Sequence, residues 1–405
     1  MPLRFLLLLG SAKELLTDHR FLSRIRRDSV IMSASALSNG DPLNKKLLAA
    51  TNGNNSERAL RLVLFLALGA IFSAPNFAQT SPAPFPGAEP SDVDARWKPW
   101  IGHYAGDLRP PPAIRWIYVV AETHGEIQIL QAAGRGEEVH YKLLERVQQN
   151  AKPSASGFVL AHKDKHELLF GDVISNQLIP GLEDDQLTQT KPTRSVEELR
   201  VEALAATPPD ETGTFRKSDL IELVPLDPAI HLDIRYATSN DFLGTPVYTQ
   251  ARAFLQRPAA EALLRALHKL QPLGYGLLIH DGYRPWYVTK IFWDATPPEG
   301  KIFVADPAQG SRHNRGCAVD LTLYDLKSGK PIEMTGAYDE MSPRSFPNYP
   351  GGTSLQRWHR DLLRWAMESE GFTVYEAEWW HFDYKDWHEY AIGNTPFEKL
   401  NVGPN

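Results

Sequence analysis

Four side chains in the C-terminal half of the sequence have the types and spacing of a metal centre. His313 precedes Asp320 by seven positions, and Glu378 precedes His381 by three positions. Two imidazoles and one carboxylate make a three-ligand zinc site that leaves one position open for water, and a spare Glu can take a proton from that water. These residues therefore predict one Zn²⁺ per chain and hydrolytic chemistry of the metallopeptidase kind.

The strand predicted over residues 317–323 carries Asp320. Alternation along this strand puts Asp320 on one face and Cys317 on the other, where the thiol faces the core. Cys317 is the only cysteine in the chain, so an intrachain disulfide is excluded, and its position indicates a buried, inert thiol rather than a metal ligand. Gly316 permits a turn just before the strand, which lets His313 fold back toward it.

A second strand, predicted over residues 378–384, carries Glu378 and His381. Strict alternation places residues three positions apart on opposite faces, so a bend or bulge is required if both side chains face one metal ion. Glu378 is the candidate general base, which takes a proton from the attacking water and passes it to the leaving amine. Taken alone, a Glu is more often an exposed or ion-paired carboxylate.

Arg284 is a further candidate for a catalytic role. It follows the apolar, strand-like residues 275–280, and loops at the ends of buried strands often carry functional residues. Its guanidinium is suited to stabilise the oxyanion that develops when water attacks a carbonyl. The alternative is a structural Arg that starts a helix or pairs with Asp281.

The composition is that of a packed globular protein, with 42% hydrophobic and 10% aromatic residues. A formal net charge of -6 gives no electrostatic basis for nucleic-acid binding. The length of 405 residues leaves room for two or three domains. Composition shifts divide the chain into an N-terminal extension (1–78), a linker (79–94), a small β-rich domain (95–190), a second linker with one short helix (191–218) and a C-terminal domain (219–400).

The N-terminal extension contains an apolar run at residues 62–72, which follows Arg58 and Arg61. This run is too short to span a bilayer comfortably but suits a signal peptide over 58–78 that is cleaved near Ala78. The expected location is therefore outside the cytoplasm, in the periplasm, with no membrane span after cleavage. The alternative is an uncleaved segment that anchors the chain in the membrane.

The two folded parts differ in pattern. Short strand-like runs between turn residues predict a small antiparallel sheet or barrel in the β-rich domain, at 116–120, 127–130, 139–143, 157–160 and 167–170. This domain shows no catalytic constellation, so we expect it to bind or position something, and its partner is unknown. The C-terminal domain mixes strand-like runs with amphipathic helices at 258–270 and 355–369, which predicts an α+β fold with a mainly antiparallel sheet and flanking helices.

Residues 219–395 resemble the zinc-dependent D-alanyl-D-alanine dipeptidases of the vancomycin-resistance type. The resemblance rests on ordered blocks, which include Arg235-Tyr236-Ala237-Thr238, Asp281-Gly282-Tyr283-Arg284-Pro285, Ser311-x-His313-x-Arg315-Gly316-x-Ala318-Val319-Asp320 and Glu378-Trp379-Trp380-His381. It implies that His313, Asp320 and His381 bind zinc. It also implies that Glu378 is the general base and that Arg284 stabilises the tetrahedral intermediate, on a compact α+β fold shared with D,D-carboxypeptidases.

The resemblance also implies contacts with the substrate. Asp339 aligns with the carboxylate that receives the free ammonium group of a dipeptide, and Ser311 and Tyr236 align with residues that line the pocket. Two departures touch the pocket rim: Asp241 stands where family members commonly have Asn, and residues 343–346 read Pro-Arg-Ser-Phe where Glu-Arg-Ser-His is usual.

The function implied is hydrolysis of D-alanyl-D-alanine or a similar small dipeptide. Export favours a role in the turnover of cell-wall peptides over antibiotic resistance. Three alternatives stay open: a D,D-carboxypeptidase that acts on larger peptidoglycan stem peptides, a catalytically silent zinc-binding recognition domain, and a main function in the β-rich domain.

Overall fold

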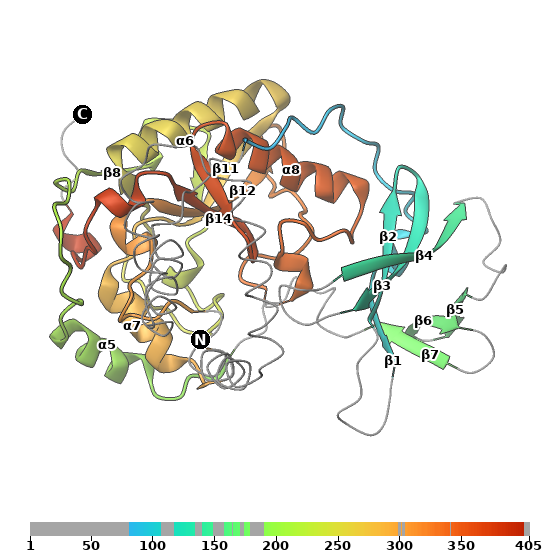
Figure 1. Cartoon of the computed structure of the whole chain (residues 1–405), viewed down its shortest axis with the longest axis horizontal. Coiled ribbons are helices and arrows are strands. Elements are labelled where there is room, and N and C mark those ends of the chain that lie inside the picture. The colour runs from blue at the N-terminus through green and yellow to red at the C-terminus, as the bar shows by residue number, and fades with distance from the viewer. Residues whose placement is uncertain are drawn as a thin grey trace, which may run out of the picture. The chain divides into compact units, whose positions relative to one another are not determined.

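The computed structural model describes residues 81–106, 117–133, 140–148, 158–163, 165–170, 174–178, 190–298, 301, 304–340 and 342–400 (Figure 1). The signal peptide predicted over 58–78 lies outside these residues. None of the helices in the described part of the chain combines the length and apolar character that a membrane crossing requires.

Seven strands of the β-rich region form one sheet in the order β4-β3-β2-β1-β7-β6-β5, and every neighbouring pair is antiparallel. We call these strands the β-sheet module: β1 (Gly102–Gly106), β2 (Ile117–Thr123), β3 (Glu126–Ala133), β4 (His140–Gln148), β5 (Phe158–Lys163), β6 (Lys165–Phe170) and β7 (Ile174–Leu178). All five strands predicted from the sequence correspond to strands of this sheet. The sequence did not indicate β1 and β7, because Gly-His-Tyr-Ala-Gly and Ile-Ser-Asn-Gln-Leu contain few strand-forming residues.

The C-terminal part is built around a five-stranded sheet in the order β13-β14-β12-β11-β9. All its neighbours are antiparallel except β11 and β9, which run parallel. The strands are β9 (Ile230–Leu232), β11 (Tyr275–Asp281), β12 (Ala318–Asp325), β13 (Phe372–Tyr375) and β14 (Glu378–Tyr384), with β8 (Leu220–Glu222) and β10 (Phe254–Gln256) as a separate pair. This architecture confirms the α+β prediction with a mainly antiparallel sheet.

The described residues of this part include the α-helices α5 (Val196–Ala205), α6 (Arg257–Leu270), α7 (Trp286–Ala295) and α8 (Ser354–Glu368). In Figure 1, α6 and α8 lie together on one side of the sheet and α5 and α7 on the other, so helices flank both sides of the sheet. Helix α8 begins at a capping box, in which Thr353 and Gln356 each bond the other's backbone N–H. It ends just before Gly371, whose φ of 89° suits the left-handed turn that terminates a helix.

Two segments predicted as linkers pack against this part instead. In α5, Leu199 and Ala203 are fully buried in the C-terminal core, and Arg200 Nη1 donates to the carbonyl of Val247 at 2.7 Å. Earlier in the chain, Trp358 Nε1 of α8 donates to the carbonyl of Gly87 at 3.1 Å. Both segments are rich in polar residues, and a few well-spaced apolar side chains are enough to dock them.

Candidate active site

Strand pairing brings two of the predicted ligands together. Asp320 of β12 lies directly opposite His381 of β14. Cys317 is fully buried on the core side, which confirms the prediction of a buried thiol, and burial raises the pKa of that thiol to about 12. His313 opens the short 3₁₀ helix before β12, and Gly316 ends that helix with a φ of 69°. The turn predicted at Gly316 is therefore present, and it carries His313 back toward the sheet.

A bulge in β14 turns Glu378 toward the same cavity as His381. Val374 of β13 pairs with Phe382, but the next residue, Tyr375, pairs with Glu378, so the intervening residues of β14 are unmatched. The bend that the sequence required between Glu378 and His381 is thus confirmed.

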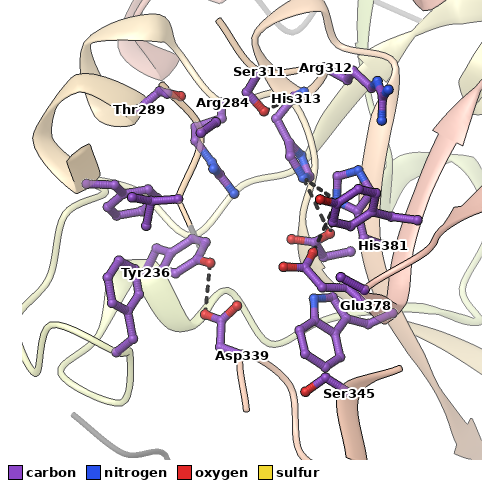
Figure 2. A pocket seen from close by; sticks show the side chains of 18 of the residues that line it. Tyr236, Arg284, Thr289, Ser311, Arg312, His313, Asp339, Ser345, Glu378 and His381 are labelled. Carbon is purple, nitrogen blue, oxygen red and sulfur yellow. Dashed lines mark hydrogen bonds and ion pairs between the residues drawn. The ribbon is translucent and has the colours of Figure 1, made fainter. Parts of the chain in front are cut away.

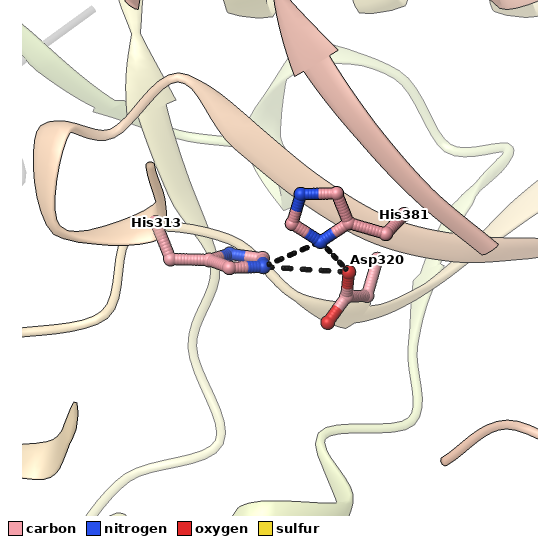
Figure 3. Close-up of side chains that lie close together, drawn as sticks. All are labelled: His313, Asp320 and His381. Atoms are coloured by element: carbon pink, nitrogen blue, oxygen red, sulfur yellow. Dashed lines mark hydrogen bonds and ion pairs between the residues drawn. The ribbon is translucent and has the colours of Figure 1, made fainter. Parts of the chain in front are cut away.

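Three side-chain atoms converge on one point (Figure 3). The Nδ1 atom of His381 lies 2.9 Å from Asp320 Oδ1 and 3.1 Å from His313 Nε2, and the third separation, between His313 Nε2 and Asp320 Oδ1, is 3.4 Å. Tetrahedral zinc with bonds of about 2.0–2.1 Å holds its ligand atoms roughly 3.3 Å apart. The three atoms therefore have the spacing that such an ion requires, and all three residues form a group that can hold a metal ion.

In each imidazole, the nitrogen that faces away from the proposed metal position is within hydrogen-bonding distance of an oxygen atom. His313 Nδ1 lies 2.7 Å from the carbonyl oxygen of Gly282, and His381 Nε2 lies 3.0 Å from Asp383 Oδ1. Because each of these oxygen atoms accepts a hydrogen bond from an imidazole N–H, the nitrogen atoms that face each other carry lone pairs when the imidazoles are neutral. Burial alone would lower the pKa of His381, but Asp383 and Asp320 outweigh it and raise that pKa well above its usual value. The negative charge that favours a proton on His381 would equally favour a metal cation that displaces that proton. The donor set fits a cation.

Glu378 stands beside this group. Its Oε2 atom lies 3.9 Å from His381 Nδ1, and its side chain is 28% exposed, toward the cavity. Burial raises the pKa of Glu378 to about 7; the nearby His381 opposes this rise and Asp320 adds to it. A carboxyl group with a pKa near neutrality can both accept and return a proton, which is the behaviour of a general base.

Arg284 is 8% exposed and is held by Asp281. Its Nε and Nη2 atoms lie 2.9 Å and 2.8 Å from Asp281 Oδ2. The other oxygen of Asp281 accepts hydrogen bonds from the Tyr248 hydroxyl at 2.7 Å and the Gly282 N–H at 2.8 Å. The pairing of Arg284 with Asp281 thus exists, but it fixes a guanidinium that points into the cavity rather than to solvent (Figure 2).

The three residues expected to contact substrate line the same cavity of about 500 Å³. The Tyr236 hydroxyl donates to Asp339 Oδ2 at 2.8 Å, and Ser311 Oγ accepts from the His313 N–H at 3.3 Å. Asp339 has a φ of 60°, a conformation that a residue other than glycine adopts only at a cost. Figure 2 shows Asp339 across the cavity from Arg284 and Ser311.

Sequence reasoning named Asp281 as a possible partner of Arg284 but missed Asp383 and Tyr338, which orient two of the proposed ligands. Asp281 holds Arg284, Asp383 engages His381, and the Tyr338 hydroxyl donates to Asp320 Oδ2 at 3.2 Å. One signal was available, because Asp383 follows His381 by two positions and therefore lies on the same face of the strand. Tyr338 reaches its partner from a distant loop, and nothing in its local sequence indicates this.

Comparisons with known proteins show similarity in the C-terminal part. A family model described as D-ala-D-ala dipeptidase matches residues 216–399. The D-alanyl-D-alanine dipeptidase of Escherichia coli K12 is 34% identical over 166 residues, which cover 41% of this chain and 84% of that protein. The enzymes of the same name from Enterococcus faecium (36% over 182 residues; 40% of this chain, 90% of that protein) and Streptomyces coelicolor (35% over 193 residues; 43% and 93%) are comparably similar.

Proposed function

The chain belongs to the D-ala-D-ala dipeptidase family, and from this premise we propose that it hydrolyses D-alanyl-D-alanine or a similar dipeptide with one Zn²⁺. The observation that carries the proposal is the convergence of His313 Nε2, Asp320 Oδ1 and His381 Nδ1, each within 3.4 Å of the other two. These atoms lie beside a carboxyl group suited to be a general base. When bound, zinc supplies Lewis-acid chemistry, which polarises the scissile carbonyl and makes water acidic enough to lose a proton near neutral pH.

Glu378 moves the proton in this proposal. It accepts a proton from the attacking water, and it then delivers that proton to the nitrogen of the leaving D-alanine. A pKa of about 7 suits both steps, because the carboxylate is available for the first and its protonated form is acidic enough for the second.

Arg284 stabilises the negative charge that develops on the carbonyl oxygen. Asp281 and the Tyr236 and Phe292 rings, 5.4 Å and 5.0 Å from the guanidinium carbon, hold the group in place before the substrate arrives. A donor that is already oriented costs no reorganisation when the charge forms.

Asp339 receives the free ammonium group of the substrate. Burial raises the pKa of Asp339 well above its usual value, and the charge on Asp320 adds to this rise, so these surroundings favour the neutral carboxyl group. A bound ammonium group would favour the ionised carboxylate instead. Tyr236 fixes the carboxyl group through its hydrogen bond, and Ser311 lines the opposite wall. One negative charge at this end of the cavity suits a dipeptide, whose amino group lies one residue from the scissile bond.

The role proposed in the cell is turnover of cell-wall peptides. It depends on the signal peptide predicted over 58–78, which would bring the enzyme to cell-wall fragments outside the cytoplasm. A D,D-carboxypeptidase that acts on stem peptides is the main alternative, since it would use the same metal chemistry. The Glu378 carboxyl group argues against a silent recognition domain, which has no need of a base.

A substrate comparison tests the proposal. We expect the full chain with zinc to hydrolyse D-Ala-D-Ala with a kcat/KM well above that for a muramyl pentapeptide ending in D-Ala-D-Ala. Asp339→Asn should lower kcat/KM for the dipeptide by about 10²-fold, because an ammonium group would lose its charged partner. A preference for the pentapeptide that survives in Asp339→Asn would instead support a carboxypeptidase.

A further inference from the structure

The loop at residues 342–352 has two sides with different neighbours. On one side, Ser342, Ser345 and Phe346 line the catalytic cavity. On the other side, Tyr349, which is 2% exposed, packs into the β-sheet module. This loop includes residues 343–346, whose sequence departs from the pattern usual in the family. The β-sheet module, which lies outside the family match, therefore contacts the loop that carries the unusual sequence at residues 343–346.

Apolar contacts join the loop at residues 342–352 to the β-sheet module. Val119 and Ala121 of β2 and Leu130 of β3 form a buried cluster with Tyr349, and Phe346 packs against this cluster. Phe346 thus has the catalytic cavity on one side and side chains of the β-sheet module on the other. Because packed interiors transmit small displacements, the position of its ring depends on the cluster beneath it.

Polar contacts fix the end of the loop. Glu122 of β2 is 2% exposed; its N–H donates to the Gly352 carbonyl at 3.0 Å, and its Oε2 accepts the Ser354 N–H at 2.7 Å. Ser354 begins α8, where the helix dipole favours a carboxylate. Arg357 Nη2 of the same helix donates to the Glu122 carbonyl at 2.7 Å, and the Tyr349 hydroxyl lies 2.8 Å from His103 Nε2.

We propose that the β-sheet module positions Phe346 and thereby determines which amino-terminal residue of a dipeptide the enzyme accepts. This rests on the dipeptidase function proposed above. The amino-terminal residue is the relevant one because Asp339, the proposed ammonium partner, is close in sequence to the loop. Figure 2 shows Asp339 and Ser345, the neighbour of Phe346, on the wall opposite Arg284. The aromatic ring limits the space for the side chain beside the ammonium group.

Two adjacent valines provide a matched test. Val119 and Val120 are both fully buried in β2, but they lie on opposite faces of the sheet. Val119 packs under Tyr349, whereas Val120 packs with Trp97 and Trp100 in a separate cluster on the far face. Val119→Ala and Val120→Ala remove the same atoms from the same strand, and only the first leaves space beneath the loop.

The readout is selectivity, measured as the ratio of kcat/KM for D-Leu-D-Ala to that for D-Ala-D-Ala in the zinc-loaded full chain. We expect Val119→Ala to raise this ratio at least about fivefold, because a less supported Phe346 yields space to a larger side chain. Val120→Ala should leave the ratio within about twofold of the wild-type value. Phe346→Ala should raise the ratio further than Val119→Ala does.

Amide hydrogen exchange of residues 343–353 provides a readout that does not depend on activity. Faster exchange in Val119→Ala than in Val120→Ala would support the positioning role, and equal exchange in the two variants would overturn it. If the wild-type enzyme cleaves dipeptides but both variants keep its selectivity, the role of the module is refuted and the proposed function stands. If the wild type cleaves no dipeptide, the proposed function fails, and the exchange data still decide whether the module holds the loop.

Discussion

At the scale of single residues, two carboxyl groups in one cavity have different surroundings and different proposed tasks. Glu378 lies 3.9 Å from His381, and burial raises its pKa to about 7, which suits the proposed role of a general base. Asp339 accepts a hydrogen bond from Tyr236 and lies across the cavity from Arg284, where a substrate ammonium group would become its partner. We propose that these different surroundings make Glu378 a proton carrier and Asp339 a partner for a positive charge, although both are carboxyl groups.

Replacement of the proposed base should separate metal binding from turnover. We expect Glu378→Gln to retain zinc but to lose about 10²–10⁴-fold in kcat, because the amide keeps the size of the side chain and cannot accept the proton. Glu376→Gln is the matched control, since Glu376 is an exposed carboxyl group two positions away. Steady-state kinetics with metal analysis of the same samples would measure both effects. Turnover near the wild-type rate in Glu378→Gln would show that another group is the base.

Asp241 presents a separate question at this scale. It is fully buried, and its Oδ1 accepts backbone N–H groups of Leu243 and Thr245 at 2.8 Å and 3.3 Å. Its Oδ2 has no hydrogen-bond partner among the described residues. Burial raises the pKa of Asp241 to about 6, and the backbone N–H groups only partly oppose this rise. The folded state therefore prefers the protonated carboxyl group.

This preference predicts a pH-dependent effect of Asp241→Asn. Because the folded-state pKa is raised, the contribution of Asp241 to stability is fully present below pH 4 and is lost as the pH rises through about 6. A neutral amide avoids that loss, so we expect Asp241→Asn to stabilise the protein by about 1–3 kcal/mol at pH 7.5 and by roughly half as much at pH 5. Denaturant titrations of both proteins at the two pH values would measure this. A benefit that is equal at both pH values would contradict it.

At the scale of elements, the site depends on how two strands meet. The pairing of β12 with β14 places Asp320 opposite His381, and the bulge in β14 adds Glu378 to the same side. Two positions after His381, regular alternation brings Asp383 to the outer nitrogen of the same imidazole. One strand therefore supplies a proposed ligand, the proposed base and the group that orients the ligand.

Loss of the orienting carboxylate should weaken the metal site without abolishing it. We expect Asp383→Ala to lower zinc affinity by about 10- to 100-fold, because the His381 imidazole would lose the partner that fixes its tautomer and orientation. Asp386→Ala is a suitable control, since Asp386 pairs with Arg216 rather than with a proposed ligand. Competition with a chromogenic chelator would give both affinities. Equal affinities in the two variants would show that Asp383 does not orient the ligand.

The sequence predicted those elements whose pattern is strong. Helix α6 was expected at 258–270 and spans Arg257–Leu270, because its apolar residues repeat at helical spacing. Helix α7 was not expected, because Trp-Tyr-Val-Thr-Lys-Ile-Phe-Trp consists largely of residues that favour strands, and burial of the helix overrides this preference. For the site, residue types and spacing indicated the ligand set. The orienting partners Asp383 and Tyr338 were not predicted, because their roles depend on three-dimensional contacts.

At the scale of the whole molecule, a family domain carries an additional module. The family match spans residues 216–399, and the β-sheet module and α5 precede it in the chain. Contacts of the module reach the loop at 342–352, next to the cavity. The relatives named above align over 84–93% of their own length to about two fifths of this chain, so the module is extra to the aligned region.

In the proposed active site, His313, Asp320 and His381 together hold one zinc ion. Metal content per chain, measured by mass spectrometry after gel filtration, tests it most directly when wild type is compared with His381→Ala and with His231→Ala, whose exposed imidazole stacks on Tyr324 instead. We predict about one equivalent of zinc in wild type and His231→Ala and a small fraction of that in His381→Ala. A full equivalent retained by His381→Ala, or an active wild-type enzyme free of metal, would contradict the claim.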